Sequence, residues 1–259
     1  MRPALTLRRI AIALLALLLL AYLALCAWLY SHQRSLLYFP QPLPPGAEAE
    51  VVLLRDSGPR VLVTTREVEG DDAMVYFGGN GEVVANRLPE FAAAFPKHAL
   101  YFLHYRGYAG SAGEPTEAGL YADALALYDK VHKQHARVIV VGRSLGSGLA
   151  VRVASERTVA RLVLVTPYDS IVGIAAEQYP LFPVSMLMRD RYESFLYAPK
   201  VRAPTRLIVA GADQVIPRHS SDLLLSRFRP GLAKRTVIEG AGHNDVSQDP
   251  RYLPLFTAP

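Results

Sequence analysis

Apolar residues occur in two patterns along the 259-residue chain. Near the amino terminus they form one unbroken run of about 20 residues, from Ile10 to Tyr30, which is long enough to cross a bilayer as a helix. From residue 51 onward they form short runs that alternate with segments of helical periodicity. This alternation predicts an α/β domain with a mainly parallel central sheet and helices on both faces.

The short apolar runs predict strands, of which the first two form an edge hairpin. The predicted strands are Val51–Leu54, Val61–Thr65, Met74–Phe77, Ala99–Leu103, Val138–Val141, Leu162–Val165, Arg206–Ala210 and Thr236–Ile238. Helices are predicted at Leu88–Phe95, Glu117–His135 and Ser220–Phe228, and one more follows Ser144. In sheets of this kind sites form at the carboxyl ends of the strands, so chemistry is expected there.

Three parts are expected along the chain. Residues 1–34 form an N-terminal membrane anchor with a helix at about 10–30, and residues 35–49 form a stiff, proline-rich spacer. Residues 50–259 form the α/β domain, in which the segment 167–204 departs from the strand–helix rhythm. Its prolines, aromatic residues and methionines predict a small cap. Two interpretations of the cap stay open: an acyl-binding pocket lining, or an excursion packed on the core.

The charges around the first apolar run predict its orientation. Arg2, Arg8 and Arg9 precede the run and only Arg34 follows it closely, so the positive-inside tendency predicts a cytoplasmic amino terminus with the domain on the far side, periplasmic in a bacterium. A cleaved signal peptide is the rival interpretation. The run is longer than a signal peptide core and has aromatic residues at its far end, so we favour an uncleaved, single-pass anchor.

Composition excludes several other classes of protein. The formal charge is +5, but four of the 28 basic residues flank the anchor, which leaves 24 to face 23 acidic residues. A nearly neutral domain has no nucleic-acid footprint. The only cysteine, Cys26, lies inside the apolar run, so neither a disulfide nor a thiolate metal site is expected. The sequence predicts no cofactor and no metal.

The strongest chemical signal is Gly142–Gly146, a G-x-S-x-G pattern between a buried strand and a helix. In this context the serine, Ser144, lies on a sharp, strained turn that lifts its hydroxyl above the sheet. Glycines flank it because neighbouring backbones come too close for a Cβ atom. The rival interpretation is a glycine-rich turn with a bystander serine.

Two further strand ends supply the partners that a nucleophilic serine needs. Asp213 follows the strand ending at Ala210, and His243 lies in a glycine turn after the last strand. The order Ser, Asp, His is that of α/β-hydrolase-type enzymes. The glycine-rich loop Gly78–Glu82 is expected to supply one oxyanion-binding N–H, from Asn80, beside the N–H of Leu145.

Other titratable residues have simpler interpretations. His132 and His135 have a spacing that suits a metal, but no third ligand is near, so we interpret them as solvated residues of a last helical turn. His219 is close to Asp213 in sequence but is expected to begin a helix. Ion-pair struts are expected at Asp169, Asp190 and Arg191.

Several motifs together resemble the α/β-hydrolase superfamily over nearly the whole domain, and more narrowly its membrane-anchored α/β-hydrolase-domain subgroup, which includes acyl-protein depalmitoylases and lysophospholipid lipases. They are Tyr105–Tyr108, Gly142–Gly148, Thr166–Ser170, Gly211–Asp213 with Ile216 and Pro217, and Gly242–Asn244. The resemblance implies a nucleophile at Ser144, an acid at Asp213 and a base at His243. Two departures stand out: Gly78 occupies the place of the family's oxyanion-loop histidine, and the usual closing helix is short or absent.

The expected activity is cleavage of carboxylic esters or thioesters, including lipid-like or acylated substrates near a membrane. A serine peptidase on the same fold and a non-catalytic, membrane-tethered binding module are the alternatives. The absence of a gating domain disfavours the first, and the presence of all three triad positions disfavours the second. The sequence predicts neither the acyl-chain length nor the oligomeric state.

Overall fold

An eight-stranded sheet forms the centre of the computed structural model, which describes residues 2–43, 45–46, 51–54 and 58–257. The strand order is β1-β2-β4-β3-β5-β6-β7-β8; β2 runs antiparallel to β1 and β4, and all other pairs are parallel. The strands are β1 Val51–Leu53, β2 Leu62–Arg66, β3 Asp72–Phe77, β4 Ala99–Leu103, β5 Arg137–Arg143, β6 Arg161–Val165, β7 Thr205–Ala210 and β8 Ala233–Ile238. The predicted fold class, with its mainly parallel sheet and edge hairpin, is confirmed.

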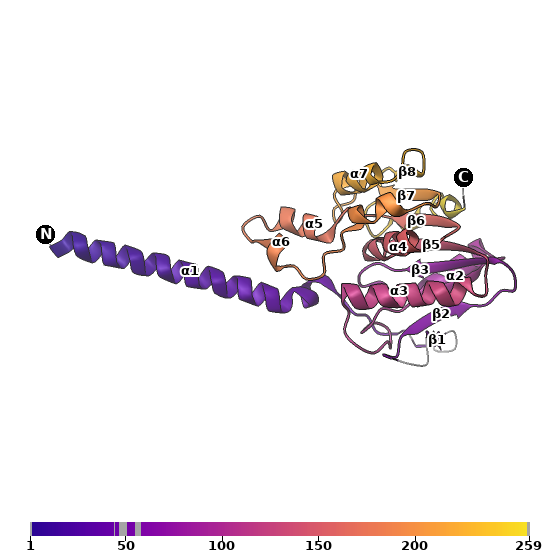
Figure 1. Cartoon of the computed structure of the whole chain (residues 1–259), viewed down its shortest axis with the longest axis horizontal. Coiled ribbons are helices and arrows are strands. Elements are labelled where there is room, and N and C mark those ends of the chain that lie inside the picture. Colours follow the sequence, from indigo (N-terminus) through magenta and orange to yellow (C-terminus); the bar gives the residue numbers. More distant parts are fainter. Residues whose placement is uncertain (1, 44, 47–50, 55–57, 258–259) are drawn as a thin grey trace.

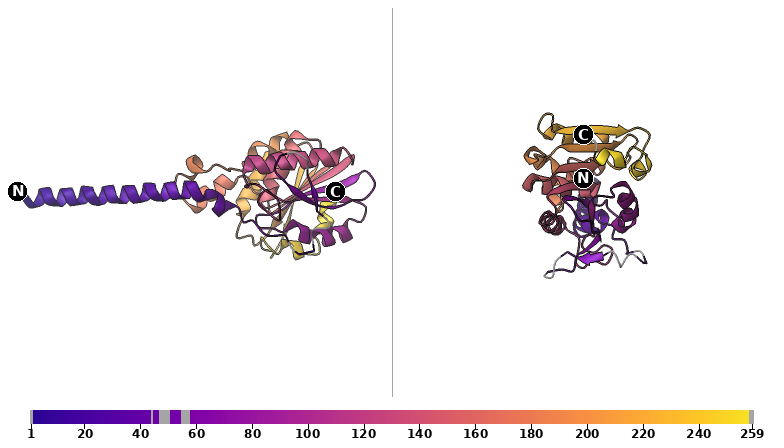
Figure 2. Two further views of the ribbon diagram at one scale, coloured as in Figure 1. Left: turned by 90° about the horizontal axis from the view of Figure 1, so that it is seen from below. Right: turned by 90° about the vertical axis from the view of Figure 1, so that its right-hand side faces the viewer.

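Helices cover both faces of this sheet (Figure 2). The α-helices are α1 Arg2–Leu37, α2 Leu88–Ala94, α3 Glu117–His132, α4 Leu145–Glu156, α5 Ile171–Gln178, α6 Val184–Leu187 and α7 Arg218–Arg227. Short 3₁₀ helices are η2 Val84–Arg87, η3 Ser194–Leu196, η4 Ala198–Lys200, η5 Val246–Gln248 and η6 Leu253–Phe256. Helices α3, α4 and α7 pack on one face, while α2, η5 and η6 pack on the other.

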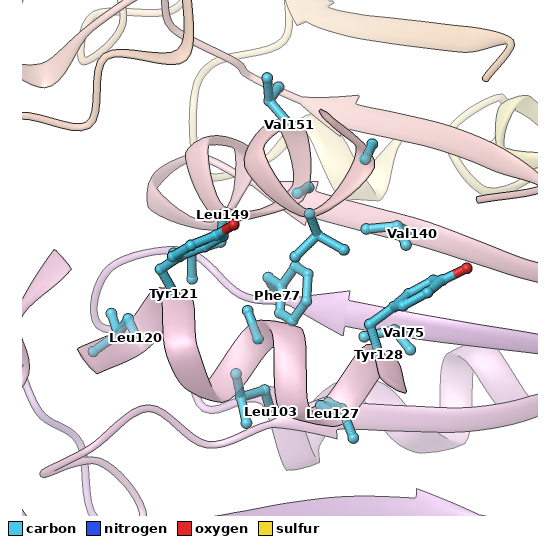
Figure 3. Packing of buried hydrophobic residues seen from close by; sticks show 14 of the residues in the cluster. Val75, Phe77, Leu103, Leu120, Tyr121, Leu127, Tyr128, Val140, Leu149 and Val151 are labelled. Carbon is cyan, nitrogen blue, oxygen red and sulfur yellow. The ribbon is translucent and has the colours of Figure 1, made fainter. Parts of the chain in front are cut away.

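The alternation of side chains along the strands explains the two layers. In β3, Val75 and Phe77 point into the core beneath α3 and α4, whereas Met74 and Tyr76 point into the core beneath α2. Figure 3 shows the first of these cores, where Leu127 of α3 lies against the sheet. Because successive strand residues face opposite sides, both sets are fully buried, as expected for a parallel strand covered on both faces.

The elements match the predicted ones closely; β8 begins three residues before its predicted start, and the end of α3 needs a correction. That helix ends at His132, three residues before its predicted end, and the chain then turns inward toward β5. His135, interpreted above as solvated, is buried: its ring lies 2.9 Å from the Tyr101 hydroxyl and 2.7 Å from the carbonyl oxygen of Gly70. His132 is exposed, as predicted.

Helix α1 extends away from the domain as a single long arm (Figure 1). Its segment Leu7–Leu37 is long and apolar enough to cross a membrane. The helix continues seven residues past Tyr30, where the apolar run was predicted to end. The predicted domain start near Glu50 and the hairpin residues Asp56 and Ser57 lie outside the described residues.

Candidate active site

Ser144 lies on a tight turn between the end of β5 and the start of α4. Its backbone angles are φ 48° and ψ −118°, in the left-handed half of φ space that residues with a Cβ rarely adopt. The turn closes because a Cβ on Gly142 would strike the carbonyl oxygen of Gly146, and a Cβ on Gly146 would strike that of Phe77. The two flanking glycines are therefore required by close backbone contact, as the motif predicts.

Three side chains from separate loops meet at this turn. The Ser144 hydroxyl lies 2.9 Å from Nε2 of His243. The other ring nitrogen of His243, Nδ1, lies 2.9 Å from one Asp213 carboxylate oxygen and 3.1 Å from the other. Asp213 follows β7 and His243 follows β8, so the carboxyl ends of neighbouring parallel strands bring together residues that are far apart in sequence.

The Asp213 carboxylate is held by its own turn. One oxygen accepts hydrogen bonds from the backbone N–H groups of Val215 and Ile216, both at 2.8 Å. Burial by itself raises the pKa of this carboxyl, but the hydrogen bond from His243 and the two backbone bonds outweigh it, and the pKa lies below its ordinary value. Asp213 is therefore ionised at neutral pH and orients the His243 ring with Nε2 toward the serine.

The glycine-rich loop after β3 passes beside the serine. The N–H of Gly79 is already engaged by the Glu82 carboxylate at 2.6 Å, which makes the N–H of Asn80 the next donor of the loop. Leu145 is the first residue of α4, where a backbone N–H has no acceptor within the helix. Asn80, Ser144 and Leu145 all line one cavity.

The side chain of Asn80 is used elsewhere. Its Oδ1 accepts from the N–H of Phe39 at 3.1 Å and from the Tyr108 hydroxyl at 2.8 Å, and its Nδ2 donates to the carbonyl oxygen of Leu37. These bonds tie the glycine-rich loop to the end of α1 and the residues just after it. They leave only the backbone of Asn80 for the oxyanion-binding role that the sequence predicts, and that role stays a prediction.

A buried ion pair beneath the site was not predicted from the sequence. Arg143, the residue before the nucleophile, lies 3.2 Å from the Glu82 carboxylate, and it also donates to the backbone carbonyl of His243 at 3.2 Å. Glu82 and Arg143 are 7% and 8% exposed. Burial raises the pKa of Glu82, yet Arg143, the Gly79 N–H and Arg87 together hold it below its usual value. Two features of the sequence could have indicated this pair: an acidic residue in the glycine-rich loop after β3, and a basic residue inside the G-x-S-x-G motif.

The cavity in front of Ser144 has a volume of about 430 Å³, within the size range of small-molecule sites. Its walls are mostly apolar and come from three regions: the turns around the serine, the cap and, unexpectedly, the last turns of α1. Cap residues in the wall include Ile171, Ile174, Phe182 and Leu187. Of the two interpretations of the cap, the structure therefore favours the pocket lining.

Other singled-out residues lie away from this centre. His219 is exposed and lies 3.1 Å from Glu177, so it does not compete for Asp213. Asp190 forms an ion pair, as predicted, and its partner is Arg34 at 2.9 Å. The prediction for Asp169 is wrong: its carboxylate accepts from the hydroxyl of Ser220 at 2.6 Å, because a short polar turn packs there instead of a cation.

Arg191 also forms an ion pair, with Glu193 at 3.1 Å. Within the described residues, no group of three or more His, Cys, Asp or Glu side chains is arranged to hold a metal ion.

No profile of a known protein family matches the chain. Among curated proteins it is 32% identical over 252 residues to the uncharacterized protein Rv2307c of Mycobacterium tuberculosis, covering 91% of this chain and 89% of the relative. It is also 31% identical over 160 residues to the α/β hydrolase domain-containing protein aho-3 of Caenorhabditis elegans, covering 60% of this chain and 46% of that protein.

Solved structures share the fold at lower identity. Mouse α/β hydrolase domain-containing protein 10 superposes with a TM-score of 0.61 at 19% identity, covering 79% of this chain and 94% of the other. A monoacylglycerol lipase of Paleococcus ferrophilus gives 0.57 at 17% identity, covering 76% and 95%. The chain belongs to the α/β-hydrolase superfamily. Its relatives and structural neighbours support the broad class of hydrolase.

Proposed function

We propose that this protein is a serine hydrolase that cleaves carboxylic esters or thioesters through an acyl-enzyme on Ser144. The observation that carries the proposal is the continuous hydrogen-bonded series from Ser144 through His243 to Asp213, with links of 2.9 Å and 2.9 Å, opening into an apolar cavity. Nucleophile, base and orienting acid within hydrogen-bond reach are the signature of nucleophilic acyl transfer.

The proposed reaction has two halves. Nε2 of His243 accepts the Ser144 proton as the serine oxygen attacks the carbonyl carbon, and the resulting oxyanion binds the N–H groups of Asn80 and Leu145. Collapse breaks the bond to the leaving alcohol or thiol, which takes the proton from His243. Water then gives a proton to His243 and attacks the acyl-enzyme, which releases the carboxylic acid and restores the serine. Asp213 stabilises the imidazolium throughout.

The proposed substrate is lipid-like, and the proposed location is a membrane. A cavity of about 430 Å³ with mostly apolar walls suits an acyl chain. The anchor is proposed to be single-pass and uncleaved, with its amino terminus cytoplasmic and the hydrolase domain on the far side. The arginines before the apolar run support this orientation.

Labelling by a fluorophosphonate probe tests the nucleophile directly. The wild type is expected to be labelled covalently, and Ser144→Ala is expected to lose the label and to lower kcat by roughly 10⁴-fold or more. Ser147→Ala, which changes the serine in the first turn of α4, is the matched control and is expected to keep the label. Circular dichroism of each variant reports whether the fold is retained.

Three outcomes would overturn the proposal. An unlabelled, inactive wild type would favour the membrane-tethered binding module. Amide hydrolysis as fast as ester hydrolysis would favour a peptidase on the same fold. Undiminished labelling of Ser144→Ala would assign the nucleophile to another residue.

A further inference from the structure

The long N-terminal helix α1 forms part of the wall of the cavity in front of Ser144.

 The last turns of α1 supply Leu29, Gln33 and Leu36 to the wall that faces Ser144. These residues lie at helical spacing on one side of α1. The segment that is long and apolar enough to cross a membrane ends at Leu37, so the same helix serves as candidate span and as pocket wall.

The cap is docked along this side of α1. The Gln33 side chain accepts from the N–H of Arg189 at 2.7 Å and donates to the carbonyl oxygen of Leu187 at 3.2 Å. Arg34 forms its ion pair with Asp190 at 2.9 Å. Figure 1 shows α5 and α6 beside the domain-proximal part of α1. The cap and the anchor are therefore held together by specific polar bonds and enclose the cavity between them.

The contact continues into the apolar run itself. The Tyr22 hydroxyl donates to the carbonyl oxygen of Leu181 at 2.9 Å, and the Tyr22 ring stacks on Phe182 with 5.9 Å between centroids. Tyr22 precedes Tyr30, the predicted end of the apolar run, by about 12 Å of helix. A helix that spans the bilayer over this run therefore carries the cap tip below the level of the headgroups.

The surface of the cap tip suits that depth. Leu181 is 81% exposed and Met186 is 84% exposed, and Tyr179 is also exposed. Large apolar side chains gathered beside an apolar helix are characteristic of a membrane-contacting surface. Polar groups gather farther along α1, where Arg34 meets Asp190 and the Arg189 guanidinium lies 4.3 Å from the Tyr30 ring centroid. This polar zone is placed to meet the headgroups.

We infer that the cavity opens sideways into the bilayer, between α1 and the cap, and that its occupant is the acyl chain of an ester lipid resident in the adjoining leaflet. The chain enters along Leu29 and Phe182, and its ester carbonyl reaches Ser144 without leaving an apolar environment. The anchor helix thus helps to select acyl-chain length in addition to tethering the domain. This inference rests on the proposed ester hydrolysis.

A tryptophan in the α1 wall tests the role of the anchor. Full-length protein in phosphatidylcholine vesicles is assayed on p-nitrophenyl esters from acetate to palmitate. Leu29→Trp is expected to lower the ratio of long-chain to short-chain kcat/KM about tenfold, because the larger ring fills the acyl path. Leu20→Trp is the matched control, since it lies about two and a half turns away, on the opposite side of the helix. Equal ratios for both variants would overturn the inference.

The depth of the cap tip is measured without any turnover. Trp28 is the only tryptophan, so a Trp28→Phe background accepts single reporters. Leu181→Trp fluorescence is expected to be strongly quenched by phospholipids brominated on their acyl chains, whereas Leu223→Trp, exposed on α7, is expected to be unaffected. Equal quenching at both positions would overturn the membrane placement.

These measurements separate the inference from the proposed function. If fluorophosphonate labels no serine, the ester hydrolase proposal fails while the quenching experiment still reports on the cap. If labelling depends on Ser144 but chain-length preference ignores Leu29, the hydrolase stands and the lateral opening is wrong.

Discussion

The two sides of the cavity are built in different ways. The side that carries Ser144 lies on loops that follow parallel strands, of which β5 and β7 are mostly buried, and most residues of α4 behind Ser144 are buried. The opposite side consists of α1 and the cap, where α6 contributes no buried residue among those described. Packing on the core fixes the side that carries Ser144, whereas a few side-chain bonds between the cap and α1 hold the opposite side together. We therefore expect precise geometry on the first side and local opening on the second.

The largest effect is expected on the side that carries Ser144, from Asp213→Asn. The amide cannot hold His243 in the tautomer that accepts the Ser144 proton, so kcat should fall by roughly 10⁴-fold with little change in KM. Steady-state hydrolysis of p-nitrophenyl butyrate measures this. His219→Gln, which alters the histidine nearest to Asp213 in sequence, is the control and should keep its activity. A loss smaller than tenfold would show that Asp213 does not orient the base.

The next effect concerns the buried pair beneath the serine. Glu82→Gln leaves Arg143 buried without its counter-charge, which should lower the free energy of unfolding by about 3–5 kcal/mol. Urea unfolding of the full chain in detergent measures this. Glu90→Gln is the matched control. Glu90 lies 3.4 Å from Arg87, which also contacts Glu82, but the Glu90 side chain is 37% exposed. Its substitution should lower the free energy of unfolding by less than about 1 kcal/mol.

The same pair predicts a pH dependence with a definite sign. The pKa of Glu82 is lower in the folded than in the unfolded protein, so its ionised form stabilises the fold above the unfolded value of about 4.3. That contribution is lost as the pH falls toward the folded pKa. The difference in unfolding free energy between wild type and Glu82→Gln should therefore be constant near neutral pH and shrink below about pH 4. A constant difference down to pH 3 would contradict the assignment to Glu82.

The same contrast separates what the sequence predicted from what it did not. Strands, the turn at Ser144 and the loops carrying Asp213 and His243 follow from local periodicity and glycine spacing, which the buried sheet enforces. Because Ser144, Asp213 and His243 each follow a predicted parallel strand, the sequence also implied that they lie at the same edge of the sheet. Their catalytic roles stay predictions.

Long-range contacts of single side chains carried no such signal. The burial of His135, the hydroxyl partner of Asp169 and the pairing of Glu82 with Arg143 each depend on which distant segment packs against the residue. The place of Leu29 in the cavity wall depends likewise on the docking of the cap onto α1. Periodicity assigns a residue to an element and a face, but not to its neighbour across the fold.

The smallest effect is expected where the cap meets the anchor, from Arg34→Gln. The ion pair with Asp190 is partly exposed on the arginine side, so its loss should cost about 1 kcal/mol or less in global stability. Asp190 keeps a second bond, from the N–H of Glu117 at 3.1 Å, which limits the cost of leaving it unpaired. Because α6 has little other support, its amide hydrogens should nevertheless exchange several-fold faster.

Hydrogen exchange measured by mass spectrometry on the full chain in detergent resolves this local effect. Arg157→Gln is the control, because Arg157 forms a comparably exposed ion pair with Asp129 at 2.7 Å, and its loss leaves every bond of α6 and of the cap to α1 intact. Faster exchange in α6 for Arg34→Gln alone would show that the anchor holds the cap closed. Equal exchange in both variants would mean that the cap keeps its position through its own packing. The two sides of the cavity would then not differ in how easily they open.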